Sequence, residues 1–146
     1  MNAPGAVTRI IPYTDQYPLR QTVLGQNPAP KPGDDAADTL HVGVFLADAL
    51  VSIASLYRER SPQMPEAAGW RLRGVATLPQ MQGRGYGRQA LGRCIDYAKA
   101  QGGTLVWCYA RLGAVDFYRA LGFHLSDEIE HPVGHEPRRY CEIAIL

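Results

Sequence analysis

The chain has 146 residues, which is enough for one hydrophobic core and short for two, so we expect a single domain over residues 1–146. Its 15 basic and 14 acidic residues give a net charge of +1, so no overall field draws it to nucleic acid or to an anionic membrane. Hydrophobic residues make up 46% and charged residues 20%, which is typical of a globular domain and excludes a disordered chain.

Cysteine usage and hydropathy indicate the compartment. Cys94, Cys108 and Cys141 lie far apart and show no paired spacing, which favours a reducing environment. No stretch approaches the roughly 20 apolar residues of a membrane helix, and the first residues lack a charged end followed by an apolar core. We therefore expect a cytoplasmic protein that is neither secreted nor inserted in a membrane.

The first half of the chain predicts one strand and one helix, followed by a hairpin. Residues 7–11 are rich in β-branched side chains and form the first expected strand. A helix is expected over residues 14–24, where Pro18 confines its start. After a proline-rich loop at 27–35, two β-rich runs at 39–47 and 49–58 predict an antiparallel hairpin.

The second half predicts strands that alternate with helices. Arginines alternate with Leu72 in the next strand, and Gly74 inside it indicates a bulge or a close backbone approach. The elements expected after the 59–68 loop are strand 70–78, helix 87–101, the buried strand 104–109, helix 114–121, strand 123–125 and a final strand at 139–146 that closes the sheet. This order predicts an α/β (α+β) fold with one mixed sheet covered by helices.

A glycine-rich turn, Gln82-Gly83-Arg84-Gly85-Tyr86-Gly87-Arg88, connects the strand at 70–78 to the following helix. Glycines let the backbone approach an anion without Cβ obstruction, and the helix N-terminus adds its positive dipole end. Arg84 and Arg88 add formal charge. The turn therefore predicts a phosphate-binding site.

Three alternatives compete with that interpretation. Gly85-x-Gly87-x-x-Ala90 satisfies a dinucleotide-binding fingerprint, but no acidic residue follows near residues 106–111 to bond a ribose. No Gly-Lys-Ser/Thr follows the glycines, which excludes the loop of nucleotide hydrolases. The glycines can also serve only a tight turn with solvated arginines.

A second segment, from Arg111 to Phe123, favours a phosphate-binding role of the turn over these alternatives. With the turn, it resembles the GNAT superfamily of acetyl-CoA-dependent N-acyltransferases. The first signature of that family, Gln/Arg-x-x-Gly-x-Gly/Ala, is met by Gln82, Gly85 and Gly87. The second, an alanine-containing helix that ends Phe-Tyr-x-x-Leu-Gly-Phe, is met by Ala114, Phe117, Tyr118, Leu121, Gly122 and Phe123. The resemblance implies a mostly antiparallel central sheet flanked by helices, with a splayed, V-shaped cleft.

The resemblance also implies how acetyl-CoA binds. Backbone N–H groups of Gly83, Arg84, Gly85, Tyr86, Gly87 and Arg88 would hold the pyrophosphate, and the pantetheine arm would pair with Val75, Ala76 and Thr77. Tyr118 would give a proton to the leaving thiolate. A backbone N–H of the 75–77 segment would polarise the thioester carbonyl.

The acceptor side is less determined. The strand at 70–78 has no carboxylate to serve as base, which leaves Glu66, Glu142 or a water-mediated route open. Arg111 stands where many relatives have asparagine and can anchor the cofactor or an acidic substrate. His135 can line the acceptor pocket. No metal is expected, because Pro132 and Gly134 prevent a helix from presenting two histidines to one ion.

We therefore expect an N-acetyltransferase that moves acetyl from acetyl-CoA directly to a primary amine. The acceptor would be a small molecule or peptide, bound by the variable loops at 12–34 and 59–69. The oligomeric state stays open, with a homodimer as one possibility. A non-catalytic acyl-CoA sensor and a nucleotide-dependent oxidoreductase are the two rival classes.

Overall fold

A computed structural model describes residues 5–25 and 30–145. The strands are β1 (Ala6–Ile10), β2 (Leu40–Leu46), β3 (Ala49–Arg58), β4 (Gly69–Thr77), β5 (Leu105–Arg111), β6 (His124–Leu125) and β7 (Arg138–Ala144), and the α-helices are α1 (Tyr17–Leu24), α2 (Tyr86–Ala100) and α3 (Val115–Ala120). Short 3-10 turns at Tyr13–Gln16, Pro79–Met81 and Leu112–Ala114 precede or connect these elements. No helix in the described ranges is long and apolar enough to cross a membrane.

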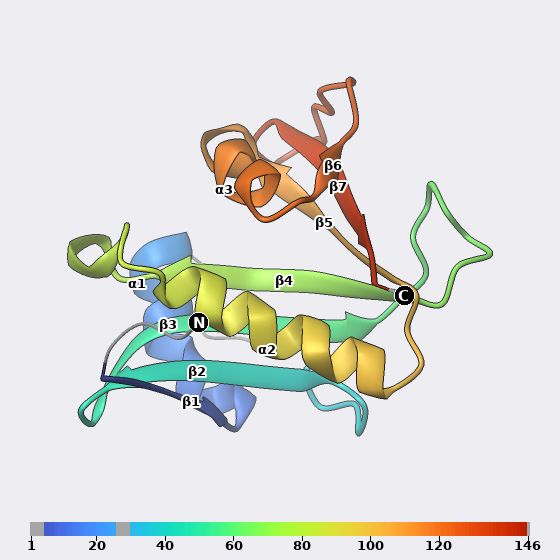
Figure 1. Cartoon of the computed structure of the whole chain (residues 1–146). Helices are drawn as coiled ribbons and strands as arrows, with labels where there is room; N and C mark the ends of the chain where they lie inside the picture. The colour runs from blue at the N-terminus through green and yellow to red at the C-terminus, as the bar shows by residue number, and fades with distance from the viewer. Residues whose placement is uncertain (1–4, 26–29, 146) are drawn as a thin grey trace.

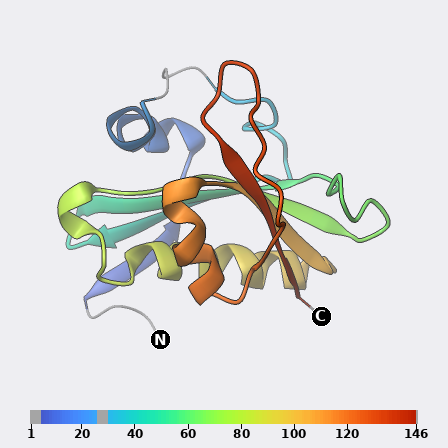
Figure 2. The same ribbon diagram turned by 90° about the horizontal axis from the view of Figure 1, so that it is seen from above.

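One seven-stranded sheet organises the molecule, in the order β1-β2-β3-β4-β5-β7-β6. The pair β4–β5 is parallel and the other pairs are antiparallel. This confirms the mixed, mostly antiparallel sheet and the predicted hairpin. Helix α2 covers one face of the sheet and α1 lies on the other (Figure 2).

Helix α2 forms because its apolar residues recur at helical spacing and face the sheet. Ala90, Leu91, Cys94 and Ala98 are fully buried in the main core. The helix ends at Ala100 and is followed by Gly102, whose φ of 80° glycine adopts easily, while the N–H of Gly103 donates to the Ala98 carbonyl at 2.8 Å.

Two expectations need correction. The first helix is divided, because residues 13–16 form a 3-10 turn and α1 begins at Tyr17 with Pro18 in its first turn, where no N–H is required. The final strand does not close the sheet, since β7 pairs with both β5 and β6 and leaves β6 at the edge. Residues 26–29 of the predicted proline-rich loop lie outside the described residues.

The sheet opens between β4 and β5. The two strands pair only at Gly69–Arg71 with Leu105–Trp107, within the described residues. Beyond that point β5, β7 and α3 turn away from β4, as Figure 1 shows. The predicted V-shaped opening is thereby present, and one long edge of β4 faces it without a strand partner.

A bulge in β4 forms where it was predicted. Arg73 pairs with Ser55 and Ala76 with Ile53, so Gly74 and Val75 together oppose Ala54. Gly74 has a φ of 62°, which is accessible to glycine and costly for other residues. The extra residue reverses which face the odd-numbered side chains point to: Arg73 lies over the Tyr57 ring, whereas Val75 packs into the core beneath α2.

Candidate active site

The glycine-rich turn presents free backbone donors at the start of α2. Gly83 and Gly85 have φ values of 78° and 89°, and Gly85 is the N-cap residue of the helix. No side chain of the described residues caps this N-terminus. The first N–H groups of a 15-residue helix therefore remain available to an anion, with the dipole favouring it.

The two sequence signatures meet in space. A Cβ added at Gly87 would come within 3.3 Å of both the Phe117 ring and the Thr77 hydroxyl. Gly87 thus lets the first turn of α2 approach α3 and the end of β4 closely. The side-chain amide of Gln82 donates to the Thr77 carbonyl at 3.3 Å, which ties the turn to the strand.

A cleft of about 750 Å³ lies between these elements. It is lined by every predicted coenzyme residue except Arg84, namely Val75, Ala76, Thr77, Gln82, Gly83, Gly85, Tyr86, Gly87 and Arg88, and also by Arg111 and Tyr118. Arg84 is exposed and lines none of the four cavities described. Residues 75–77 lie where β4 has separated from β5, so their outer backbone edge is open to an extended ligand.

Tyr118 lies where this cleft joins a second, smaller cavity of about 200 Å³, since its side chain lines both. The residue is only 6% exposed and its ring packs edge-on against Phe117 and Phe123. Burial, with the Cys108 and Cys141 thiols nearby, raises the pKa of Tyr118 well above its ordinary value. The hydroxyl therefore stays protonated and can donate a hydrogen bond at this junction.

The smaller cavity is cationic. The charged residues that line it are Lys31, Arg71, Arg73 and Arg111, and among the described residues no aspartate or glutamate does so. Burial, followed by the charge of Arg73, lowers the pKa of Lys31 to about 8. Burial and the charge of Arg71 lower the pKa of Arg73 as well. A positive potential thus fills the space beyond Tyr118.

Other candidate residues lie elsewhere. His135 is exposed in the turn between β6 and β7 and lines neither cavity, although its neighbour Glu136 lies 3.5 Å from Arg111. Glu66 lines a separate cavity at the opposite end of β4, and Glu142 lies on β7, where it pairs in register with Trp107. No group of three potential metal ligands occurs within the described residues.

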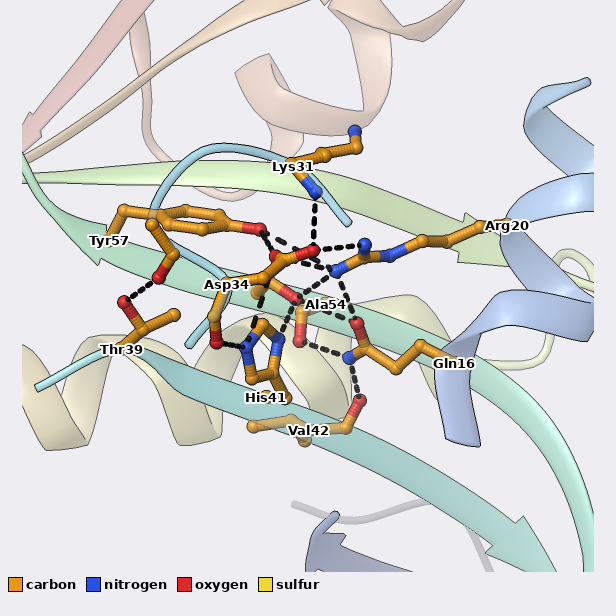
Figure 3. A network of polar contacts seen from close by, with 11 residues as sticks. Gln16, Arg20, Lys31, Asp34, Thr39, His41, Val42, Ala54 and Tyr57 are labelled. Atoms are coloured by element: carbon orange, nitrogen blue, oxygen red, sulfur yellow. Dashed lines mark hydrogen bonds and ion pairs between the residues drawn. The ribbon is translucent and has the colours of Figure 1, made fainter. Parts of the chain in front are cut away.

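A buried polar network supports the cationic cavity from the α1 face of the sheet (Figure 3). Its members are Gln16, Arg20, Asp34, His41, Ser55 and Tyr57. Arg20 holds Asp34 by two hydrogen bonds of 2.8 and 3.1 Å, and the Lys31 N–H donates to the same carboxylate at 2.7 Å. The Lys31 side chain points away from that carboxylate.

Asp34 is the centre of this network. Burial alone would raise its pKa, but hydrogen bonds from Arg20, Tyr57 and the Lys31 amide outweigh burial and hold the pKa at about 2. His41 is buried too, which lowers the pKa of its ring, and its Nε2–H donates to the Asp34 carbonyl at 2.8 Å. The loop that carries Lys31 is therefore fixed to β2, β3 and α1.

Sequence reasoning missed the cationic cavity and this network. The arginines of β4 appeared only as part of a strand pattern, and Lys31 only as part of a loop. One signal was available: polar side chains such as His41 and Ser55 interrupt apolar strands, and buried polar groups need partners.

Comparison with known proteins agrees with this geometry. Residues 13–123 match the Acetyltransferase (GNAT) family. The chain is 32% identical to the uncharacterized N-acetyltransferase YitI of Bacillus subtilis over 124 residues, which is 79% of this chain and 80% of that protein.

Solved structures share the fold. The ribosomal-protein-S18-alanine N-acetyltransferase of Escherichia coli superposes with a TM-score of 0.77 at 18% identity, over 96% of this chain and 94% of that one. YncA of Salmonella typhimurium, solved with its cofactor acetyl-CoA, gives a TM-score of 0.72 at 16% identity, over 97% and 94%. With two signatures that meet at one cleft and a family match over residues 13–123, the chain belongs to the GNAT acetyltransferase family.

Proposed function

We propose that the protein transfers an acetyl group from acetyl-CoA directly to a primary amine. One observation carries the proposal: the uncapped N-terminus of α2 and the buried Tyr118 line the same cleft. An anion site and a proton donor are thus combined in one cleft, as a phosphorylated thioester requires.

The residues present fit coenzyme A. Phosphate oxygens would accept from the N–H groups of the turn and from Arg88, which lines the cleft. The amides of the pantetheine arm would pair with the open edge of β4 at residues 75–77. That arm would lead the thioester to Tyr118.

The transfer itself breaks one bond and forms another. The amine nitrogen attacks the thioester carbonyl carbon, the carbon–sulfur bond breaks, and sulfur takes a proton while nitrogen loses one. A buried phenolate is costly, so Tyr118 would give its proton to sulfur only as it recovers one that originates on nitrogen. Products are the acetylated amine and the free thiol.

The acceptor must be a neutral amine when it attacks, and the cationic cavity offers a route without a carboxylate base. The Lys31 ammonium already shows the effect, because its pKa falls to about 8 in this environment. An acceptor ammonium beside the same arginines would lose its proton more readily for the same reasons. Water that reaches the cavity would carry the proton away.

Two arginines of the turn provide the test. Arg88 lines the cleft and Arg84 does not, although both are exposed. We expect Arg88→Ala to raise the KM for acetyl-CoA by roughly threefold to tenfold, the range for an exposed charge-assisted contact, and Arg84→Ala to change it less than twofold. The measurement is thiol release with a panel of primary amines, together with the mass of the acetylated product.

Binding and turnover separate the rival functions. Acetyl-CoA should raise the melting temperature of the protein, and NAD should not. Stabilisation by acetyl-CoA with no acetylated product from any amine would instead identify a non-catalytic acyl-CoA sensor. Stabilisation by NAD alone would refute the coenzyme assignment.

A further inference from the structure

The charges of the smaller cavity are not balanced within the protein. Arg71 has a partner in Glu59 at 3.0 Å, and Arg111 lies 3.5 Å from the exposed Glu136. Arg73 and the side-chain ammonium of Lys31 have no ion pair among the described residues, since Asp34 is already engaged by Arg20. Two cations therefore face this space without a counter-charge.

Partial burial makes the unpaired charges of Arg73 and Lys31 energetically unfavourable. Arg73 and Lys31 are both only partly exposed, and Arg73 lies on β4 between the Tyr57 ring and the cavity, 5.6 Å from the ring centroid. Arg71 adds a third charge on the same strand, with its Nε buried and unpartnered. A partly desolvated, unpaired cation is stabilised strongly by an anion that reaches it.

These cations line a cavity that adjoins the proposed coenzyme cleft. The cavity shares Val75, Ala114 and Tyr118 with the coenzyme cleft, so a molecule within it would lie next to the thioester end. A planar guanidinium matches the two oxygens of a carboxylate, and a space of about 200 Å³ suits a small acceptor.

We propose that the acceptor is an amine that carries a carboxylate, as an amino acid does, and that Arg73 with Lys31 binds this carboxylate. The assignment rests on the proposed acetyl transfer. The amine would then face Tyr118 and the carboxylate would face β4. Polycationic acceptors are disfavoured, because they would bring further positive charge into a cavity that already has in its wall two cations unpaired within the described residues.

Matched acceptors test the charge directly. We would compare amino acids with their carboxamides, and include spermidine as a polycation. Loss of the nearby carboxylate lowers the pKa of the amine, so intrinsic reactivity favours the carboxamides and works against our expectation. We expect kcat/KM to be about 10- to 100-fold higher for the amino acids. Dipeptides whose second residue carries either a side-chain carboxylate or the corresponding amide would also be compared. They show whether the carboxylate must belong to a free amino acid or can belong to a peptide.

Variants assign the preference to the cavity. Arg73→Gln should reduce kcat/KM for amino acids by about 10- to 100-fold and leave the carboxamides within threefold. Arg73→Lys should restore part of the loss. Arg60→Gln, at an exposed arginine on the loop beyond β3, is the matched control and should keep the preference. A melting-temperature increase with acetyl-CoA shows that each variant is folded and binds the coenzyme.

A binding readout separates the two proposals. With coenzyme A present, an N-acetyl amino acid should raise the melting temperature more than its N-acetyl carboxamide, and Arg73→Gln should abolish the difference. Acetylation of carboxamides or spermidine as fast as amino acids would overturn the carboxylate assignment while leaving acetyl transfer intact. The absence of any acetylated product would overturn the proposed transfer, and equal binding of the two ligands would overturn the assignment independently.

Discussion

A single buried phenol is the residue on which the proposed chemistry depends. Tyr118 is 6% exposed, lies at the junction of two cavities, and has a pKa raised first by burial and then by Cys108 and Cys141. A phenol in this state donates hydrogen bonds and resists ionisation over the physiological range. Its role would be to donate a hydrogen bond and then a proton to the leaving sulfur, and not to act as a free base.

Replacement of Tyr118 by phenylalanine tests that role. We expect kcat to fall by about 100-fold, near the lower limit for loss of a general acid, with little change in the KM for acetyl-CoA. Tyr97→Phe is the control, because that residue lies near the C-terminal end of α2, lines neither cavity, and donates its hydroxyl to the Asp38 carbonyl at 3.3 Å. Stopped-flow thiol release gives both constants, and an unchanged kcat would remove Tyr118 from the reaction.

The parts of the site that lie within short sequence motifs could be predicted, and the parts that come from distant segments could not. The turn and Tyr118 lie in short motifs whose spacing is set by one loop and one helix, so sequence alone pointed to the cleft that these residues line. Lys31 and Arg73 are 42 positions apart and meet only because a loop folds over β4. Composition and motifs contain no signal for such a pair, and they pointed instead to His135, which is exposed and lines neither cavity.

At the scale of elements, the bulge in β4 lies between the proposed coenzyme cleft and the proposed acceptor cavity. Before Gly74 the odd-numbered side chains point toward the cationic cavity, and after it Val75 points into the main core. A regular strand would place Arg73 and residue 75 on the same face. One extra residue therefore lets a single strand serve both halves of the site.

Two glycine-to-alanine changes test the conformational argument, with opposite expected signs. Gly74→Ala forces a Cβ into the left-handed region and should lower the free energy of unfolding by about 1–2 kcal/mol. Gly92→Ala lies within α2, with no atom within 4 Å of the new Cβ, and should raise it by about 0.8–1 kcal/mol. Urea denaturation measures both, and stabilisation by Gly74→Ala would contradict the left-handed assignment.

Sequence patterns identified the elements better than their arrangement. Hydrophobic periodicity, together with the glycines that end the elements, predicted the bounds of α2 and of the β2–β3 hairpin to within a few residues of those observed. The insertion of β7 between β5 and β6 is a long-range pairing that no local pattern encodes. Gln16, the last residue of the 3-10 turn before α1, donates its amide to the carbonyls of Val42 and Ala54, a long-range contact that the apolar spacing does not reveal.

At the scale of the whole molecule, the buried network joins segments that are distant in sequence. Arg20 and Asp34 are 2% and 0% exposed, and they connect α1, the loop at 31–38 and the strands β2 and β3. Because the Lys31 N–H donates to Asp34, the same ion pair fixes the wall of the cationic cavity, where we propose that the acceptor binds. Stability and acceptor binding should therefore be coupled through Asp34.

Asp34→Asn tests the contribution of this network to stability and its dependence on pH. The substitution leaves the Arg20 charge buried without its partner, so at pH 7 we expect a loss of about 3–5 kcal/mol in the free energy of unfolding. Asp35→Asn, at the exposed neighbouring residue, should change it by less than 0.5 kcal/mol. Urea titrations between pH 7 and pH 2 provide the comparison.

The sign of the pH effect follows from the depressed pKa of Asp34. The unfolded carboxyl binds a proton near pH 3.8 and the folded one near pH 2, so the stabilisation is complete above about pH 4 and is lost as the pH falls toward 2. The difference between wild type and Asp34→Asn should therefore narrow over that interval, while Asp35→Asn follows the wild type throughout. A difference that stays constant to pH 2 would mean that the Asp34 carboxylate is not held in its charged form by Arg20.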